Sequence, residues 1–510
     1  MKSYNTTAPS QTAFNKTYIW IIFCFICLHS FSCRKFVDIE SNSRQTLIET
    51  SNDCQLLLND YANMNVGFPS DGEASSDDYY FNDARFLASA ITIEDQNIYS
   101  WQYNALRTSA SPQWQYSYKV IYISNLVLEA LSKQNPTDNH LLINDIRGQA
   151  LFYRAYSFYN LAQLYAKPYN SASAKQDLGI PLRLGSDINA KSERGTLEQT
   201  YSQIINDLTE SVNLLSEKLI VPSRPNKAAA YAMLARVYLS QEDYQNALTN
   251  ANAALQFNSQ LLDYNTISTN SATPFTRFNK EVIFHSLMAV GNILNPGTAT
   301  VVGAKINEDL YVQYGTNDLR KKIFFKENSQ SAQLLNPAYP TTLGAPQFLN
   351  VTLPDGTYRF TGNYEPAASA ALFNGLAVDE MFLIRAECYA RTDNVNAALN
   401  DLNSLLVKRW VTGTYVTKTA ISASDALNQI LTERRKELLM RGQRWTDGRR
   451  LKLNFARQTK SVIFSGLSNS PIRTVSVSNS YNLPAGDLRF TLLIPNEVII
   501  NSTLSQNSRQ

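Results

Sequence analysis

Apolar and polar positions alternate along much of this chain with the period of an α-helix. Between residues 101 and 131 a mostly apolar stripe recurs every three or four positions, and a second stripe fills 141–165. Pro168 follows the second stripe and marks its end, because proline cannot continue a helix. The first stripe consists of Trp114, Tyr118, Ile121, Tyr122, Asn125 and Leu128. We predict two long helices, with Trp114, Tyr118 and Tyr122 in the core.

Further helices are predicted at 45–65, 197–215 and 423–441, and a helical pair begins at Lys227. An internal repeat accompanies this pair. The segment Ala235-Arg236-Val237-Tyr238, followed by Ala247-Leu248, recurs at the same spacing as Ala386-Glu387-Cys388-Tyr389, followed by Ala398-Leu399. Small alanines at these places let two antiparallel helices approach closely, which is the packing of tetratricopeptide-type helix pairs. Because the copies lie about 150 residues apart, we predict an interrupted helical scaffold.

The interruption covers residues of about 260–370, which are rich in Asn, Thr, Gly, Pro and Tyr and show no long periodicity. We expect loops and short strands there, and similarly irregular structure at 411–420 and 457–510. Binding residues tend to lie on such loops. The prediction is therefore a mainly α fold, with one domain over 33–510 and helices mainly at about 45–260 and 371–450.

The amino terminus resembles a lipoprotein signal. Lys16 precedes an apolar run over 18–28, which is too short to span a hydrocarbon core of roughly 30 Å but suits a signal peptide. The run leads to Ser30-Phe31-Ser32-Cys33, with small residues at the positions before the cysteine. We expect a signal peptide over 1–32 and a lipid on Cys33. The alternative is an ordinary secretory signal that leaves Cys33 a plain thiol.

Composition narrows the classes of protein. The 510 residues are 44% hydrophobic, which is enough for a sizeable core. Lys and Arg number 46 against 43 Asp and Glu, and the first 32 residues hold two lysines and no acid, so the remainder is nearly neutral. This balance gives no electrostatic reason to expect a nucleic-acid partner. Whether Cys54 and Cys388 form a disulfide is not determined by their spacing.

Residue types typical of catalytic and metal sites are scarce. Beyond the signal the only histidines are His140 and His285, and no zinc-protease, serine-hydrolase, phosphate-loop or dinucleotide motif occurs. We therefore expect no enzyme activity, no metal and no cofactor. A carboxylate pair for glycoside hydrolysis is the remaining option, with Asp77 and Asp78 as candidates. Adjacent acids in a loop are usually turn formers or hydrogen-bond acceptors, which argues against it.

Six segments resemble the SusD/RagB family of nutrient-binding outer-membrane lipoproteins, and they extend over most of the chain after the signal. The segments are 33–38, 147–156, 178–182, 224–239, 384–403 and 430–438. The family's F-E-G-x-R-W-x-D-L-x-R motif is also present over Met440–Arg450, but it has lost the acid before Gly442 and the Leu after Asp447. We interpret Arg444, Trp445 and Asp447 as scaffold, and Asp318-Leu319-Arg320 as a structural ion-pairing turn.

The resemblance implies a helical core of four tetratricopeptide-like pairs and a loop-rich face that holds ligand above a SusC/RagA-like TonB-dependent transporter. It also implies attachment to the outer membrane through the lipid on Cys33, facing the cell exterior. The ligand is usually a glycan in this family and a peptide in some members. A protein-interaction scaffold that contacts no nutrient is the alternative, because tetratricopeptide pairs commonly bind proteins.

Two loops offer the aromatic faces and planar polar groups that sugars need. By positional analogy with the family, we expect ligand to contact Asp77, Asp78, Tyr79, Tyr80, Tyr99, Trp101, Tyr103 and Asn104. The alternative is that Trp101 and Tyr103 pack against the start of the next helix. Further candidates in the 260–370 segment are Tyr311, Tyr314, Tyr358 and Tyr364.

Overall fold

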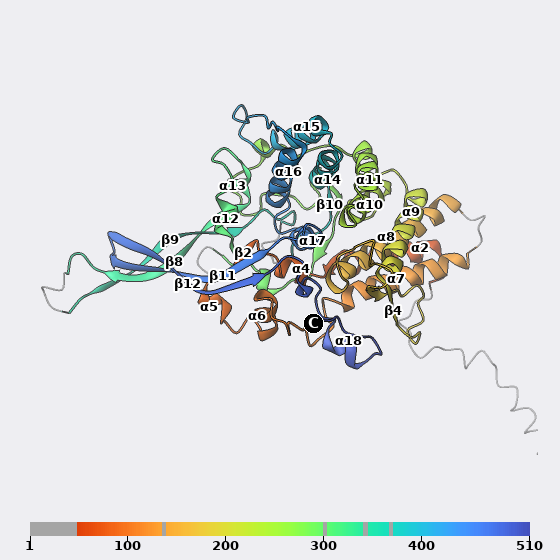
Figure 1. Cartoon of the computed structure of the whole chain (residues 1–510), viewed down its shortest axis with the longest axis horizontal. Helices are drawn as coiled ribbons and strands as arrows, with labels where there is room; N and C mark the ends of the chain where they lie inside the picture. The colour runs from red at the N-terminus through yellow and green to blue at the C-terminus, as the bar shows by residue number, and fades with distance from the viewer. Residues whose placement is uncertain (1–47, 135–138, 299–302, 340–344, 367–370, 510) are drawn as a thin grey trace, which may run out of the picture. The chain divides into compact units, whose positions relative to one another are not determined.

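Long helices pack one upon the next through the chain (Figure 1). The structure is a computed structural model and describes residues 48–134, 139–298, 303–339, 345–366 and 371–509. Helix α7 packs on α8, α8 on α9, α9 on α10, α10 on α11, α11 on α14, and α14 on both α15 and α16. Their bounds are α7 Gln115–Ser132, α8 His140–Tyr165, α9 Leu197–Leu214, α10 Lys227–Ser240, α11 Tyr244–Phe257, α14 Val378–Arg391, α15 Val395–Leu406 and α16 Ala423–Glu437. The mainly helical fold predicted from the sequence is confirmed.

The internal repeat falls on two equivalent helix pairs, α10 with α11 and α14 with α15. Ala235 and Ala247 in the first pair, and Ala386 and Ala398 in the second, have no exposed surface. A larger side chain at any of them would separate the helices, because the interior is close-packed. The second pair continues the first in space, since α11 packs on α14 despite the intervening segment.

Helices α8 and α9 also approach closely. A Cβ on Gly148 of α8 would lie 2.9 Å from Leu215 Cγ, and Ser211 Oγ donates to the Gly148 carbonyl over 2.9 Å. Thr196 and Gln199 start α9 with a capping box, in which each side chain accepts a hydrogen bond from the other's backbone N–H. The sequence thus specifies both the start of α9 and its contact with α8.

Short elements join these helices. The helix predicted at 45–65 is divided into α2 Ser51–Leu58 and α3 Tyr61–Met64, because Asp60 starts a new helix by accepting from Asn63 N at 3.2 Å. Residues 45–47 lie outside the described residues. The other short helices are α4 Asp71–Ala74, α5 Asp83–Phe86, α6 Ile93–Tyr99, α12 Glu308–Tyr311, α13 Arg320–Ile323, α17 Gln443–Arg450 and α18 Asn496–Ile500, with 3-10 turns η2 Tyr264–Thr266, η3 Asn292–Leu294 and η5 Leu488–Phe490.

Four two-stranded sheets fix the connections between helices. In the first, β1 Val66–Phe68 pairs in parallel with β6 Leu287–Met288. The other three are antiparallel: β2 Tyr79–Tyr80 with β7 Lys305–Ile306, β3 Leu178–Pro181 with β4 Arg194–Thr196, and β5 Val282–Phe284 with β10 Leu376–Ala377. Strands β6 and β7 thereby join the segment 260–370 to the amino-terminal region.

Two long hairpins correct the prediction of short strands and of an irregular 457–510 segment. Strands β8 Phe325–Leu335 and β9 Phe348–Phe360 form one hairpin, and β11 Phe455–Leu467 and β12 Ser470–Leu483 form the other. They lie side by side through a parallel contact between Leu467 and Leu335, in the order β12-β11-β8-β9 (Figure 1). Most of β12 is exposed on both faces, so it adds little to the core although Val475, Val477, Tyr481 and Leu483 alternate with polar residues.

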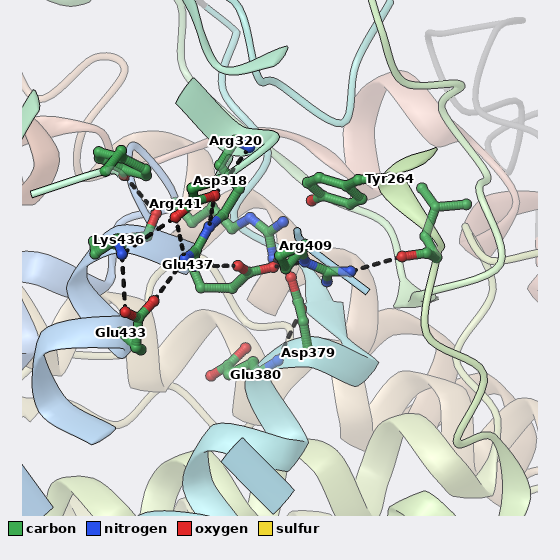
Figure 2. Close-up of polar contacts among 12 residues, drawn as sticks. Tyr264, Asp318, Arg320, Asp379, Glu380, Arg409, Glu433, Lys436, Glu437 and Arg441 are labelled. Carbon is green, nitrogen blue, oxygen red and sulfur yellow. Dashed lines mark hydrogen bonds and ion pairs between the residues drawn. The ribbon is translucent and has the colours of Figure 1, made fainter. Parts of the chain in front are cut away.

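A buried ion network connects the 260–370 segment to α16, and Figure 2 shows it. Arg320 has no exposed surface and lies 2.7, 2.6 and 2.9 Å from carboxylate oxygens of Asp318, Glu433 and Glu437. Arg409 extends the network, since it contacts Glu437 at 2.7 Å. The predicted structural role of the Asp318-Leu319-Arg320 turn is confirmed.

The described residues show the state of the cysteines and whether any helix could span a membrane. Cys54 and Cys388 are both buried, and each remains a free thiol. None of the helices in the described ranges combines the length and the apolar character that crossing a bilayer requires. Residues Thr50–Gln510 form one unit by their contacts, whereas Cys33 and the predicted signal lie outside the described residues.

Candidate binding cleft

Three of the rings predicted to meet ligand lie in the interior around an arginine. Tyr79, Tyr99 and Trp101 are at most 3% exposed, and their ring centres lie 4.5, 4.2 and 4.9 Å from the Arg457 guanidinium. Trp101 Nε1 also donates to the Ser75 carbonyl at 3.0 Å. Each ring face is therefore used in a cation–π contact within the chain. The structure corrects the prediction that these rings form a ligand surface.

Asp77 and Asp78, the adjacent acids, form hydrogen bonds with arginines of the same chain. Asp77 accepts from Arg444 Nε at 2.6 Å and from Nη2 at 3.0 Å, and Asp78 accepts from Arg435 Nε at 2.9 Å. Burial raises the pKa of Asp77, but the neighbouring Arg435 and Arg444 outweigh it and hold the pKa below its usual range. These two carboxylates bind arginines in the interior and do not face each other across a cleft.

The remaining predicted residues differ in exposure. Tyr80 is buried and donates its hydroxyl to Glu308 at 2.9 Å. Tyr103 is 60% exposed, with the Arg489 guanidinium 4.6 Å from its ring, and Asn104 is exposed. Of the eight predicted residues, only Tyr103 and Asn104 are open to solvent.

The tyrosines of the 260–370 segment fall into two groups. Tyr314 and Tyr364 are 1% exposed and belong to the core. Tyr311 and Tyr358 are half-buried and stack with ring centres 3.7 Å apart and planes inclined by 14°. Lys321 Nζ lies 4.8 Å from the Tyr311 ring, so that ring is covered on both sides.

A cleft of about 560 Å³ lies instead beside the aromatic stripe of α7. Trp114, Tyr118, Tyr122 and Asn125 line it, although the three rings were predicted to be core. Trp114 is 7% exposed, Tyr118 is half-buried and Tyr122 is 39% exposed. The prediction was wrong for Tyr122, because the helix face that carries these rings borders an open cleft. We call this the aromatic cleft.

Two segments far away in the sequence complete the aromatic cleft. One is the stretch after β3, which contributes Pro181, Arg183, Gly185, Ile188 and Ser192. The other is α18 with the residues after it, which contributes Glu497, Val498, Asn501, Ser502 and Leu504. Ala110, Gln115, Lys119 and Ile121 complete the lining. Its wall is therefore apolar and aromatic on α7, with polar side chains along the edge.

Hydrogen bonds hold the first of these segments against α7. The Tyr118 hydroxyl donates to the Pro181 carbonyl at 2.8 Å, and Asn125 Nδ2 donates to the Arg183 and Gly185 carbonyls at 2.9 and 3.1 Å. Arg154 fixes Asn125 by donating to its Oδ1 at 2.9 Å. Burial raises the pKa of Tyr118 well above its ordinary value, so the phenol stays a donor at physiological pH.

The aromatic cleft suits binding and offers no reactive pair. Gln115 is exposed, and neither its amide nor the Tyr122 hydroxyl has a hydrogen-bond partner among the described residues. A half-exposed ring beside free polar groups is an arrangement that takes a ligand with both C–H faces and hydroxyls. The described ranges contain no cluster of three His, Cys, Asp or Glu side chains placed to hold a metal ion.

Comparison with known proteins gives two family matches. Residues 35–239 match a family described as starch-binding and associating with the outer membrane, and residues 379–482 match the SusD family. A SusD-like protein, P2, from Formosa agariphila is 30% identical over 139 residues. That alignment spans 27% of this chain and 25% of the relative.

Solved structures share the fold over nearly the whole chain. A SusD superfamily protein from Bacteroides thetaiotaomicron has a TM-score of 0.68 at 22% identity, covering 90% of this chain and 100% of its own. A protein titled a putative sugar-binding protein from Bacteroides vulgatus has a TM-score of 0.66 at 22% identity, covering 91% and 99%. A laminarin-binding SusD-like protein has a TM-score of 0.59 at 17% identity, covering 90% and 99%.

Proposed function

Because the chain belongs to the SusD family, we propose that it is a cell-surface binding protein that captures an oligosaccharide in the aromatic cleft. In this proposal a lipid on Cys33 anchors it to the outer membrane, and it delivers the saccharide to a SusC/RagA-like TonB-dependent transporter. It does no chemistry on its ligand. The half-exposed Tyr122 in a cleft otherwise fixed by hydrogen bonds is the observation that carries the proposal.

The dimensions and chemistry of the aromatic cleft support a saccharide ligand. A volume of about 560 Å³ lies within the range of pockets that hold small ligands. Tyr122 offers a ring face for a sugar's C–H surface, and Gln115 offers an amide for its hydroxyls. Asn501 offers its amide oxygen, since its Nδ2 already donates to the Glu497 carbonyl at 2.8 Å. The family description, starch-binding, and the laminarin-binding structural relative make glucose oligomers the first ligands to test.

The test is calorimetric titration of the purified protein with malto- and laminari-oligosaccharides, compared with Tyr122→Ala. Tyr122 is 39% exposed, so its truncation leaves the core intact. We expect the variant to lose affinity by roughly tenfold, which is about 1.4 kcal/mol. Tyr358→Ala is the matched control, because Tyr358 is also half-buried and does not line the aromatic cleft.

The outcomes separate the sites. Loss of affinity in Tyr122→Ala alone supports capture in the aromatic cleft. Loss in Tyr358→Ala alone places the saccharide on the stacked tyrosines and overturns the assignment of the cleft. Absence of saccharide binding by the protein overturns saccharide capture itself.

An oligopeptide is the second candidate ligand, because part of the aromatic cleft is aliphatic. Ile121, Ile188, Val498 and Leu504 line it together with the rings, and Ile188 is 76% exposed. Such side chains bind apolar peptide side chains by burying them from water. Titration with a mixture of short peptides tests this: binding of peptides but not of saccharides, weakened by Ile188→Ser, would replace the first proposal.

A further inference from the structure

A second cavity, of about 640 Å³, lies beside the carboxyl end of α8 and has a different chemistry. Its lining includes Tyr169 and Ser171 after α8, Gln241 after α10, and Arg449 and Lys452 at the end of α17. Hydroxyl, amide and cationic groups dominate these side chains. We call it the basic cavity.

Arg449 has no counterion in the part of the chain that the structure describes. Its side chain belongs to a residue only 5% exposed, and Nη2 donates to the Ala166 carbonyl. Nε and Nη1 are buried without a hydrogen-bond partner, and no carboxylate of the described residues lies within 4.0 Å of the guanidinium. Burial lowers the pKa of Arg449 to about 10, which agrees with an uncompensated charge.

Arg450, the next residue, is a buried arginine whose charge is compensated. Arg450 contacts Glu387 at 2.6 Å and Asp447 at 2.9 Å, and it is equally buried. Arg449 donates only to the Ala166 carbonyl at the end of α8, whose helix dipole favours a cation. A helix end offsets only a small part of the desolvation penalty of a buried guanidinium, so most of the Arg449 charge is uncompensated by the described residues.

Two of the three acids that line the basic cavity are paired with a cation. Asp177 lies 2.7 Å from Lys167 Nζ, and Asp487 lies 2.7 Å from Arg489 Nη2. Glu242 accepts from the Tyr244 hydroxyl at 3.2 Å. Lys452 is exposed and has no carboxylate of the described residues within 4.0 Å. Arg449 and Lys452 therefore outnumber Glu242, which no described cation pairs, and the lining keeps a positive excess.

We propose that the basic cavity binds the oxyanion of an acidic saccharide and that Arg449 pairs with it. This rests on the proposed function, because the saccharide class comes from there, and it adds a preference for negative charge. Guanidinium groups match the geometry of carboxylates and sulfates and are weakly hydrated, which suits a partly enclosed site. The free N–H groups of Arg449 are covered in this structure, so the proposal requires the guanidinium to turn toward the cavity when the anion enters.

The test compares one saccharide with and without its charge. Trigalacturonate and its methyl ester are titrated into the protein at low salt, and a sulfated galactose oligomer is compared with its unsulfated form. These two pairs distinguish a carboxylate from a sulfate as the source of the oxyanion. We expect the charged member of at least one pair to bind at least tenfold more tightly, and Arg449→Gln to reduce this preference to less than twofold.

Two further variants separate the proposal from its alternatives. Without ligand, Arg449→Gln is expected to keep the melting temperature of the parent, because it removes an unpaired charge, whereas Arg450→Gln lowers it. Tyr122→Ala is expected to leave the charge preference unchanged. A charge preference that survives in Arg449→Gln, or no preference for either charged member, overturns the inference. Neutral saccharide binding that persists in that case leaves the proposed function standing.

Discussion

The guanidinium of Arg457 lies 4.9 Å from the centre of the Trp101 ring, and 358 residues separate Arg457 from Tyr99, whose carbonyl it contacts at 2.9 Å. Arg457 is 3% exposed, and no carboxylate of the described residues lies within 4.0 Å of it. The rings and the carbonyls of Ala74 and Tyr99 are therefore its partners. This cage joins β11 to the amino-terminal loops and is part of the scaffold.

Trp101→Ala is expected to affect stability and not binding. Removing a buried Trp typically lowers the free energy of unfolding by about 3–5 kcal/mol, and here it also opens the cage around Arg457. Urea unfolding followed by circular dichroism measures the loss, and calorimetry on the folded variant measures saccharide affinity. If Trp101→Ala were as stable as the parent but bound saccharide more weakly, Trp101 would be a ligand-binding residue.

Arg320→Met is expected to lower the free energy of unfolding by about 3–5 kcal/mol, because three buried carboxylates lose their shared cation. Those carboxylates lie within 2.9 Å of Arg320, which has no exposed surface. Arg147→Met is the control, since Arg147 and its partner Glu210 are both 51% exposed at 3.4 Å. An exposed pair contributes at most about 1 kcal/mol, so equal losses in the two variants would contradict a role of the network in joining the 260–370 segment to α16.

The helical scaffold could be predicted because its signals are local. Ala235 and Ala386 lie at the same point of repeated motifs, and both are fully buried between helices. On strand β12, Val475 and Val477 alternate with serines, but their side chains are 40% and 51% exposed, so this pattern does not mark a core face. Its partner strand, and not a buried face, keeps it extended.

The binding residues could not be read from sequence for a related reason. Periodicity places Trp114 and Tyr122 on one face of a helix, but it does not tell what covers that face. Two segments that follow much later in the chain border it without covering Tyr122. Conversely, Trp101 lies in a stretch whose aromatic and polar residues suggest a ligand-binding loop. Its ring instead contacts the guanidinium of Arg457, which is far away in the sequence.

Gly448→Ala is expected to lower the free energy of unfolding by about 1–3 kcal/mol through overpacking. A Cβ at Gly448 would lie 2.3 Å from Cζ of Phe455, whose ring fills the space beside the glycine. Chemical denaturation measures the change, with Gly291→Ala as control because its Cβ would meet only ordinary contacts at 3.6 Å.

The same contact predicts coupling between the two positions. In a double-mutant cycle, Gly448→Leu with Phe455→Ala is expected to cost less than the sum of the single changes, because the Leu refills the space left by the ring. Additive changes would show that Phe455 does not occupy that space.

Glu73 is expected to make the protein less stable as pH rises. Its carboxyl is 1% exposed, and burial, followed by the neighbouring Asp78, raises its pKa from 4.5 to about 8. In the unfolded chain the carboxyl loses its proton near pH 4.5, whereas the folded protein keeps the proton until about pH 8. Between these values the unfolded state binds fewer protons than the folded state, so the free energy of unfolding falls with rising pH.

Glu73→Gln removes this dependence: its amide oxygen keeps an acceptor for Gly442 N, and its NH2 group can donate to Ser76 Oγ, these two atoms lying 2.7 and 3.0 Å from the carboxyl oxygens of Glu73. Urea unfolding at pH 5, 6.5 and 8 then measures the difference in stability between variant and parent. That difference should grow in favour of the variant, by at most about 1.4 kcal/mol for each pH unit. Glu193→Gln, at a side chain 72% exposed, should follow the parent at every pH. Parallel curves for Glu73→Gln and the parent would mean that the carboxyl titrates alike in both states and that its proton is not retained in the folded protein.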